Sequence, residues 1–397
     1  MIINSLLDSD LYKFSMQQAI LHQFPGAMVE YKFKCRTPGI NLVQHIEEIK
    51  HEIGEWCTLR FADDELLWLS GIRYLKVDYI EYLRNYKPNP MYVHVIPMVD
   101  DSIEIIIRGP WVTTVLYEVP ILAIVNEVYF KHMNKTPKEV ADGCLERLSN
   151  KIITIKEMVL NDFKFADFGT RRRFSLEVQY HVLKILKSEL PNNLVGTSNV
   201  LFAKKLGLTP IGTHAHEWFM ACESMVRLCD SQKFALQKWA DEYRGDLGIA
   251  LSDCLGMDAF FRDFDPYFSK LFDGCRHDSG DPYVWCDKLI KHYTDMKIDP
   301  TTKTAVFSDG LTIKSAIDIY NTFKGKIKMM FGIGTHLSND IPGFDPIQIV
   351  MKLTKCNGQD VAKLSDSPGK QMCENAEYLK YLKQQFQIKE KSFGNAI

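Results

Sequence analysis

Two histidines separated by one residue stand where a short apolar run ends and a helix is expected to begin. They are His214 and His216, within the stretch Thr209-Pro-Ile-Gly-Thr-His-Ala-His-Glu-Trp-Phe219. The charge of a histidine changes near neutral pH, and its ring can act as a base, a nucleophile or a metal ligand. A loop between a strand and a helix is where an α/β protein places such a group. Which of these roles applies depends on the other groups that the fold places near the two histidines.

Charged and glycine-rich corners recur elsewhere in the chain. Arg171-Arg172-Arg173 opens a helix after a glycine, where guanidinium and free N–H groups bind phosphate or carboxylate, although at least one arginine is expected to make ordinary ion pairs. Arg276-His-Asp-Ser-Gly-Asp281 could bind an anion through Arg276 and a sugar hydroxyl or Mg²⁺ through Asp278 or Asp281, or form a capped turn. Phe331-Gly-Ile-Gly-Thr335 could bind phosphate or form a tight turn.

These motifs follow short apolar runs, and a helical stretch follows each of them. Seven such units succeed one another, with runs that begin near residues 163, 193, 209, 247, 274, 304 and 326. The series predicts a buried parallel sheet, and this many units favour a barrel over an open sheet. The active site of such a barrel lies at the C-terminal ends of its strands. The unusual motifs all stand at such ends.

The parts outside this series are expected to be mixed in structure. We predict an α+β N-terminal domain over residues 1–135, with little sign of chemistry, and a β/α barrel domain over 136–397 with a C-terminal hairpin and helix. In the first domain the patterns predict helices at 8–24, 41–86 and 111–130, a strand at 28–35 and a hairpin across 99–101, with Asp8 or Ser9 as the first N-cap.

Composition bounds the class of protein. The chain has 397 residues, 46% hydrophobic and 25% charged, and a formal net charge of −2, which is usual for a soluble globular protein. Nothing global therefore points to nucleic acid or to an anionic membrane. Ten cysteines without a C-x-x-C pair favour reduced thiols in a cytoplasmic protein. The N-terminus does not resemble a signal peptide, and no apolar stretch is expected to reach the ~18 residues of a membrane span.

The spacing His214-x-His216 also permits a metal interpretation. Some amidohydrolases hold zinc with such a pair at the end of a barrel strand, but zinc needs further ligands from other strands. A metal-dependent amidohydrolase on a similar barrel therefore remains the alternative function.

Taken in order, the motifs resemble those of nicotinate phosphoribosyltransferases of the bacterial type. Each stretch alone is weakly specific, but together they run nearly from end to end. The matching stretches are Ser5-Leu-Leu-Asp-Ser-Asp-Leu-Tyr-Lys, Gly109-Pro-Trp, Glu118-Val-Pro, Asp167-Phe-Gly-Thr-Arg-Arg-Arg-Phe-Ser, Val195-Gly-Thr-Ser-Asn, Gly212-Thr-His-Ala-His-Glu-Trp, Arg276-His-Asp-Ser-Gly-Asp-Pro, Phe331-Gly-Ile-Gly-Thr and Ala362-Lys-Leu-Ser-Asp-Ser-Pro-Gly-Lys.

The resemblance implies an irregular TIM-like barrel of the type II phosphoribosyltransferase kind and an activity in NAD salvage. Nicotinate, 5-phosphoribosyl 1-diphosphate, ATP and water would give nicotinate mononucleotide, diphosphate, ADP and phosphate. The motif places the phosphohistidine of this reaction at His216 and leaves His214 an incidental role. Mg²⁺ would accompany the phosphates, and the enzyme would be a homodimer with shared active sites.

The same resemblance implies roles for residues at the nicotinate end of the site. Tyr12 and Phe168 would stack on the pyridine ring, with Tyr12 reaching across a head-to-tail dimer. Thr213 and Arg276 would contact nicotinate or its carboxylate, with Arg171 nearby.

Further implied roles concern the sugar, its phosphate and the choice of base. Asp278 would serve the ribosyl group catalytically, and Gly334 and Thr335 would bind the 5′-phosphate. Relatives that use nicotinamide are expected to carry Asp at the position of Ser198, where a carboxylate accepts an amide N–H but repels an acid. Serine would therefore favour nicotinate.

Overall fold

Six of the seven expected apolar runs form one parallel sheet in the computed structural model, which describes residues 1–133, 137–158, 162–367, 371 and 373–388. Their strands are short, with largely buried residues, as expected when helices cover a parallel sheet. The order across the sheet is β5 (Leu194–Thr197), β4 (Phe165–Asp167), β10 (Lys328–Ile333), β9 (Thr304–Phe307), β8 (Gly274–His277) and β7 (Ile249–Leu251).

The third expected strand, which begins at Thr209, does not form a ladder. Only an isolated parallel bridge joins Pro210 to Thr197 of β5. Proline has no N–H to donate, so this segment cannot continue a regular strand pairing. The prediction of a strand here is therefore wrong, although the segment occupies the place of one.

The same segment closes the sheet into an irregular barrel. Beyond the bridge to β5, the Thr213 side chain donates a hydrogen bond to the Ile249 carbonyl of β7 (3.2 Å). The Leu251 N–H of β7 donates to Nε2 of His214 (3.3 Å). Side-chain hydrogen bonds therefore span the gap between the two edge strands, which confirms the predicted barrel class.

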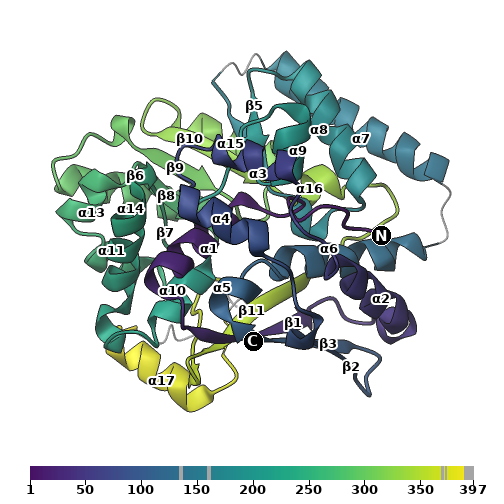
Figure 1. Ribbon diagram of the computed structural model, residues 1–397. Coiled ribbons are helices and arrows are strands. Elements are labelled where there is room, and N and C mark those ends of the chain that lie inside the picture. The colour runs from purple at the N-terminus through teal and green to yellow at the C-terminus, as the bar shows by residue number, and fades with distance from the viewer. Residues whose placement is uncertain (134–136, 159–161, 368–370, 372, 389–397) are drawn as a thin grey trace, which may run out of the picture.

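Helices surround this barrel (Figure 1). They are α8 (Leu176–Glu189), α9 (Val200–Leu206), α10 (His216–Cys222), α11 (Ser231–Tyr243), α12 (Met257–Asp263), α13 (Pro266–Leu271), α14 (Pro282–Asp295), α15 (Ile313–Phe323) and α16 (Thr335–Ser338), while α7 (Pro137–Glu157) packs on α8 and β6 (Arg244–Leu247) leads into β7.

A five-stranded antiparallel sheet lies beside the barrel and combines N-terminal strands with two strands that follow the barrel in the chain. Its order is β12 (Gln359–Asp360), β11 (Ile349–Cys356), β1 (Met28–Cys35), β3 (Ile103–Pro110) and β2 (Val93–Pro97). The predicted hairpin between β11 and β12 is present, and Asn357 (φ 51°) and Gly358 (φ 79°) adopt the left-handed conformation that a tight hairpin turn requires. Since β11 pairs with β1, the chain returns after the barrel to the sheet of the N-terminal strands.

The N-terminal helices follow the predicted ranges with two differences. They are α1 (Leu11–Gln23), α2 (Ile46–Trp56), α3 (Asp63–Ser70), α4 (Val77–Asn85), α5 (Trp111–Thr114) and α6 (Glu118–Lys131). The N-cap of α1 is Asp10 and not Asp8 or Ser9 as predicted, and the Asp8 side chain pairs with an arginine. The helix expected at 111–130 is broken in two, and Pro120 lies in the first turn of α6, where a proline is tolerated.

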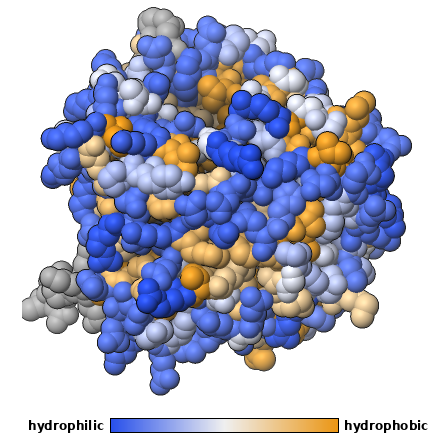
Figure 2. Space-filling view, turned by 60° about the vertical axis from the view of Figure 1, so that its left-hand side comes forward, coloured by the Kyte–Doolittle hydropathy of each residue, from blue (hydrophilic) through white to orange (hydrophobic). Residues whose placement is uncertain are grey.

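One stretch of the described chain, Trp111–Lys131, is long and apolar enough to span a membrane by length and composition, contrary to the sequence expectation. Within the protein, 94% of its most apolar window is buried, as in a core helix. Figure 2 shows a face of the molecule that is mainly hydrophilic, with hydrophobic residues in scattered groups.

The expected domain boundary after residue 135 falls within residues 134–136, outside the described residues, and stays a prediction. The C-terminal helix predicted over 374–388 is α17 (Ala376–Gln385). The last three residues of the motif that begins at Ala362, residues 368–370, also lie outside the described residues.

Candidate active site

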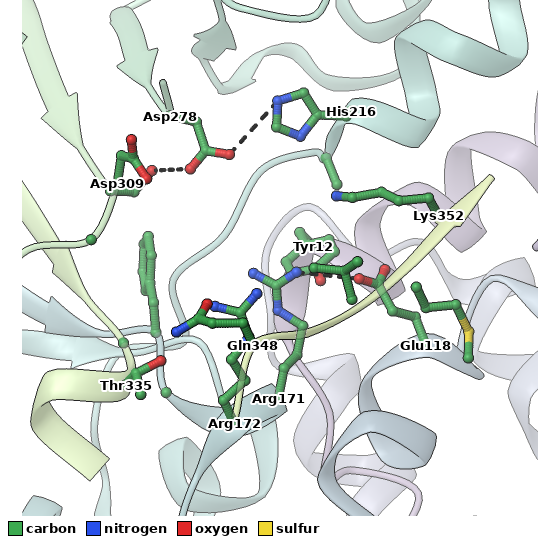
Figure 3. Close-up of a pocket in the computed structure, with 18 of the residues that line it drawn as sticks. Tyr12, Glu118, Arg171, Arg172, His216, Asp278, Asp309, Thr335, Gln348 and Lys352 are labelled. Carbon is green, nitrogen blue, oxygen red and sulfur yellow. Dashed lines mark hydrogen bonds and ion pairs between the residues drawn. The ribbon is translucent and has the colours of Figure 1, made fainter. Parts of the chain in front are cut away.

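A cavity of about 350 Å³ opens at the C-terminal ends of the parallel strands, with β11 as its far wall (Figure 3). Residues from both the N-terminal and the C-terminal part of the chain line it. The lining includes Tyr12, Arg36, Glu118, Phe168, Arg171, Arg172, His216, Glu217, Arg276, Asp278, Ser308, Asp309, Gly334, Thr335, Gln348, Lys352 and Lys363. The structure thus brings together eight of the ten site residues expected from the sequence.

His216 begins α10 and is held by a buried carboxylate. Its Nε2 lies 2.8 Å from Oδ1 of Asp253, at the end of β7, and 3.7 Å from Oδ2 of Asp278. Burial, and next the charge of Lys363, lower the pKa of His216 to about 4, so the ring is neutral at pH 7. An ionised carboxylate only accepts hydrogen bonds, so the ring proton lies on Nε2 and the lone pair on Nδ1.

Asp253 is buried and fully engaged. Its Oδ2 accepts from Ser279 Oγ (2.6 Å) and pairs with Lys363 Nζ (2.9 Å). Burial opposes its ionisation, but His216 and Lys363 hold the pKa of Asp253 well below its usual range. The carboxylate is therefore ionised and fixes both the tautomer and the orientation of His216.

His216, Asp253 and Asp278 offer ligand atoms within 4.8 Å of one another, the arrangement of a possible metal site. The oxygens of Asp253 already bind His216, Ser279 and Lys363, so it is a poor ligand. Asp278, whose Oδ1 accepts from Ser308 Oγ (2.9 Å), and Asp309 both line the cavity and are better placed for a divalent ion (Figure 3).

Cations gather on the opposite wall of the cavity. Arg171 and Arg172 come from the barrel side, Arg36 from the end of β1, and Lys352 from β11. Burial, and next repulsion from Lys363, lower the pKa of Lys352 to about 8. Burial and the charge of Arg171 lower the pKa of Arg172 to about 10. Burying several positive charges together costs free energy, and a bound polyanion would offset that cost.

A buried ion network orients Arg171. Lys13 of α1 is fully buried and pairs with Glu118 (2.7 Å) and Glu217 (2.6 Å). Arg171 Nη1 then pairs with Glu118 (3.2 Å; Figure 3). Burial opposes ionisation of Glu118, but Lys13 and Arg171 lower its pKa to about 2. Glu118 therefore keeps its charge and directs the guanidinium group of Arg171 toward the cavity.

An aromatic and cationic corner lies at another end of the cavity. A Cβ at Gly332 would lie 2.3 Å from the Phe168 ring, so the ring can rest on the β10 backbone only because residue 332 is glycine. Tyr12 and Arg276 also line the cavity. The Tyr12 hydroxyl and Arg276 Nε are buried without a hydrogen-bond partner among the described residues. Such a corner fits a flat aromatic acid.

Two expected site residues do not line the cavity. The Ser198 hydroxyl donates to Oδ1 of the buried Asp10 (2.7 Å), and the Thr213 hydroxyl donates to a carbonyl of β7. His214, expected to be incidental, is buried with its ring edge-on to Trp239, 4.6 Å between centroids. These side chains support the wall of the site from behind.

Tyr12 lines the cavity of its own chain, and the expectation that it reaches across a dimer stays a prediction. The Leu11 N–H donates to the Ser198 carbonyl (2.8 Å), which ties the start of α1 to the end of β5. Across from it, a Cβ at Gly212 would lie 2.9 Å from the Tyr12 nitrogen. This close packing fixes the backbone at Tyr12, whose side chain lines the cavity.

Arg173, unlike its two neighbours, faces away from the cavity. It is fully buried, with a two-pronged ion pair to Asp8 (2.6 and 2.8 Å) and a third bond to Glu127 (2.7 Å). The expectation that one arginine of the triplet makes ion pairs is confirmed, although the pairs are buried and not on a solvated turn.

Sequence reasoning missed several residues that line the cavity or bind its histidine. Asp253 stands at a strand end, and Glu118 and Lys363 lie in matching motifs, so a signal existed for these three. Arg36 and Lys352 come from the antiparallel sheet, and nothing in their local sequence marks them. The N-terminal domain, in which little chemistry was expected, supplies Tyr12, Arg36 and Glu118 to the cavity.

The chain is similar to known proteins over nearly its whole length. Residues 163–390 match the nicotinate phosphoribosyltransferase (NAPRTase) family, and residues 7–126 match the NAPRTase N-terminal domain. The nicotinate phosphoribosyltransferase of Acidovorax sp. (strain JS42) is 53% identical over 397 residues, covering 98% of this chain and 99% of that protein. That of Ralstonia pickettii (strain 12J) is 53% identical over 391 residues, covering 98% and 100%.

Solved structures show the same likeness. The crystal structure of nicotinate phosphoribosyltransferase from Vibrio cholerae superposes with a TM-score of 0.94 at 40% identity, covering 98% of this chain and 95% of that chain. The enzyme of that name from Porphyromonas gingivalis gives 0.93 at 35% identity, covering 98% and 100%. The shared architecture confirms the expected fold class.

The amidohydrolase alternative finds no support in these similarities. The structure also separates its two zinc candidates, since Nε2 of His214 accepts a backbone N–H while His216 faces Asp253. The H-x-H spacing therefore does not make a shared metal site.

Proposed function

This chain belongs to the nicotinate phosphoribosyltransferase family, and we propose that the cavity at the barrel mouth is its active site. The activity joins nicotinate to the ribosyl group of 5-phosphoribosyl 1-diphosphate, giving nicotinate mononucleotide and diphosphate for NAD salvage. ATP is the co-substrate of the family reaction. The roles of individual residues below are our proposal.

The observation that carries this proposal is the pairing of His216 with Asp253. With its proton on Nε2, the neutral ring presents the Nδ1 lone pair, and that nitrogen points toward the centre of the cavity (Figure 3). Nδ1 attacks the γ-phosphorus of ATP, the bond from that phosphorus to the bridging oxygen breaks, and ADP leaves with the electron pair. Asp253 then stabilises the positive charge of the phosphorylated ring. Water later hydrolyses the phosphohistidine.

The cationic wall supports binding of the diphosphate of the sugar substrate. Departure of diphosphate from the ribose C1 leaves positive charge on the sugar and negative charge on the leaving group. Arg36, Arg172 and Lys352 neutralise the latter, and Asp278 stabilises the former. Gly334 and Thr335 offer backbone N–H groups at the start of α16 to the 5′-phosphate.

The aromatic corner supports binding of nicotinate. Phe168 and Tyr12 sandwich the pyridine ring, and Arg276 and Arg171 bind the carboxylate. Ser198 and Thr213 act indirectly, Ser198 through its hydrogen bond to Asp10.

Mg²⁺ is the expected companion of the phosphates, and the residues fit it. Magnesium prefers oxygen ligands and is commonly held by one or two carboxylates together with substrate phosphates. Asp278 and Asp309 line the cavity and would hold it, and the ion would neutralise phosphate charge there. We further propose a cytoplasmic homodimer with shared active sites.

The test is an assay of the purified protein with nicotinate and 5-phosphoribosyl 1-diphosphate, with and without ATP. We expect nicotinate mononucleotide in both cases and faster synthesis with ATP, accompanied by ADP. Equal rates with and without ATP would show that the coupling to ATP is absent. Failure to form the mononucleotide under either condition would refute the assignment of the cavity.

A further inference from the structure

The helix that begins at His216 ends at a buried acid. Helix α10 runs over His216–Cys222, and Glu223 is its C-cap. Seven residues of helix separate the two side chains by roughly 10 Å. The Glu223 side chain is buried, with only 2% of the residue exposed, and lies outside the cavity lining.

Glu223 binds two separate segments of the C-terminal part. Its Oε2 accepts from the backbone N–H of Ala362 (2.9 Å) and from the hydroxyl of Tyr378 on α17 (2.8 Å). The Gln359 side chain also donates to the Glu223 carbonyl (3.1 Å). One acid therefore ties the helix of His216 to β12, to the segment after it and to α17.

The segment that Glu223 holds leads back to His216. Lys363, next to Ala362, forms an ion pair with Asp253 (2.9 Å), and Asp253 binds His216 (2.8 Å). Covalent and polar links therefore connect His216 back to itself. They run through α10, Glu223, Ala362, Lys363 and Asp253. Each link is buried, so each is strengthened by its surroundings.

Helix α17 packs on the same segment through apolar side chains. Ala362 is itself a member of this small core, so the position of α17 and that of the Lys363 backbone depend on each other. The buried members are Leu228, Leu255, Ala259, Ala362, Leu364, Leu382 and Phe386.

We propose that Glu223 and Tyr378 are positioning residues for the phosphorylation of His216. They hold Ala362 where Lys363 can keep Asp253 charged and bonded to the histidine, which couples the C-terminal helix to the ATP-dependent step. This inference rests on the proposed role of His216. The links from Glu223 through Lys363 to Asp253 would act in phosphorylation of His216 and would not act in transfer of the ribosyl group.

A neutral substitute for Glu223 shows whether its hydrogen bonds or its charge matter. Burial raises the pKa of Glu223 to about 8, so the carboxyl is largely protonated at pH 7. Glu223→Gln therefore keeps both its neutral state and an oxygen that accepts from Ala362 and Tyr378. Glu223→Ala removes the link, and Tyr378→Phe removes only the tie to α17. Tyr381→Phe, the same change at an exposed site on α17, is the matched control.

The experiment measures transfer of ³²P from [γ-³²P]ATP to the full-length protein, together with ATP-independent synthesis of nicotinate mononucleotide. We expect the labelling rate to fall about 10- to 100-fold in Glu223→Ala, because displacements of about 1 Å near a reacting group have such effects. Loss of one buried hydrogen bond in Tyr378→Phe should cost about fivefold. Glu223→Gln and Tyr381→Phe should stay within about twofold, and ATP-independent synthesis should not change.

His216→Ala distinguishes this inference from the function on which it rests. If the wild-type protein takes up no label, or if His216→Ala labels as the wild type does, the phosphohistidine is wrong and the inference falls with it. If the wild type labels through His216 and Glu223→Ala and Tyr378→Phe label at the same rate, only the inference is overturned. An equal loss of both reactions would also overturn it, because that pattern indicates general destabilisation.

Discussion

Two ion networks start from arginines two residues apart in the chain and serve different ends. Arg173 lies in a closed network, where Asp8 and Glu127 bind its guanidinium group and leave it fully buried. Arg171, two residues earlier, has one carboxylate partner, Glu118, and remains 41% exposed in the cavity. In the closed network all the charges pair with one another and stabilise the fold. In the open network, that of Arg171 and Glu118, guanidinium N–H groups remain to bind a ligand.

The difference shows how to recognise a functional cation. Both arginines lie in the same motif and both contact carboxylates, so neither residue type nor the presence of an ion pair separates them. What separates them is the balance of charge around each. The cavity wall gathers Arg36, Arg172 and Lys352, and the pKa of the lysine falls to about 8 as a result of burial and repulsion. That imbalance is relieved only by an anion.

The largest expected effect is at His216, in the cavity that Arg171 also lines. We expect His216→Ala to abolish the stimulation by ATP, a loss of at least about 100-fold in the ATP-dependent rate, because the nucleophile is gone. Slow synthesis without ATP should remain. Steady-state assays of mononucleotide formation at saturating and zero ATP measure both, and intact stimulation in the variant would contradict the assignment.

Substitution in the closed network of Arg173 should lower the free energy of unfolding. Asp8→Ala leaves Arg173 buried with one partner instead of two, and we expect a loss of about 3–5 kcal/mol in the free energy of unfolding. Chemical denaturation monitored by fluorescence measures it. Asp64→Ala, which removes an exposed carboxylate paired with Lys204, is the control and should leave the midpoint unchanged. A neutral result for Asp8→Ala would show that the two networks do not differ as described.

Lys352 should respond mainly in binding, because its ammonium group is part of the cationic wall of the cavity. We expect Lys352→Met to raise the KM for 5-phosphoribosyl 1-diphosphate about tenfold, through loss of a cation from the wall. Lys355→Met, on the exposed part of the same strand, should change nothing.

The pH dependence follows from the same residue. In the wild type the KM should rise as the pH passes 8, where Lys352 loses its proton, and this rise should be absent in Lys352→Met. The lowered pKa means that the folded state binds fewer protons than the unfolded state above pH 8. The contribution of Lys352 to stability therefore increases with pH between about 8 and 10.4. A wild-type stability that falls across that window would contradict this sign.

Ser198 lies between the two networks, since its neighbour Asn199 binds Asp8 while Ser198 itself binds Asp10. Ser198→Asp would place a second carboxylate beside Asp10, whose pKa burial already raises. The pair would share a proton, and its remaining negative charge behind the cavity wall would disfavour the carboxylate of nicotinate. We expect the ratio of kcat/KM for nicotinamide over nicotinate to rise about tenfold. Ser198→Ala should leave this ratio unchanged; a shift of equal size there would remove the carboxylate from the explanation.

The smallest effect is expected at His214. Its ring accepts one backbone N–H and packs on Trp239, behind the cavity wall. His214→Gln should lower the free energy of unfolding by about 1 kcal/mol, the worth of one hydrogen bond, and should preserve stimulation by ATP. Loss of that stimulation would give His214 a role that its position does not provide.

Local patterns in the sequence predicted much of the barrel side of the site. Strands β4, β5 and β7–β10 follow from their apolar runs, and because parallel strands end at one edge, the polar corners after them had to meet. Asp278 and Arg276 follow from this rule, whereas His216 follows a run that only takes the place of a strand. The run at Thr209 fails as a strand, since Pro210 lacks the donor that a ladder needs.

Tertiary structure alone decided the other half of the cavity. Alternation along β11 predicts that Lys352 and Lys355 face opposite sides, but not that one side meets a barrel mouth. That outcome depends on the pairing of β11 with β1, more than 300 residues away in the chain. The same holds for the arginine triplet, where only packing determines which side chain faces the cavity. Sequence therefore determined which groups were available and which strand ends they follow, while long-range pairing decided which of them share a site and which keep a charge free for the substrate.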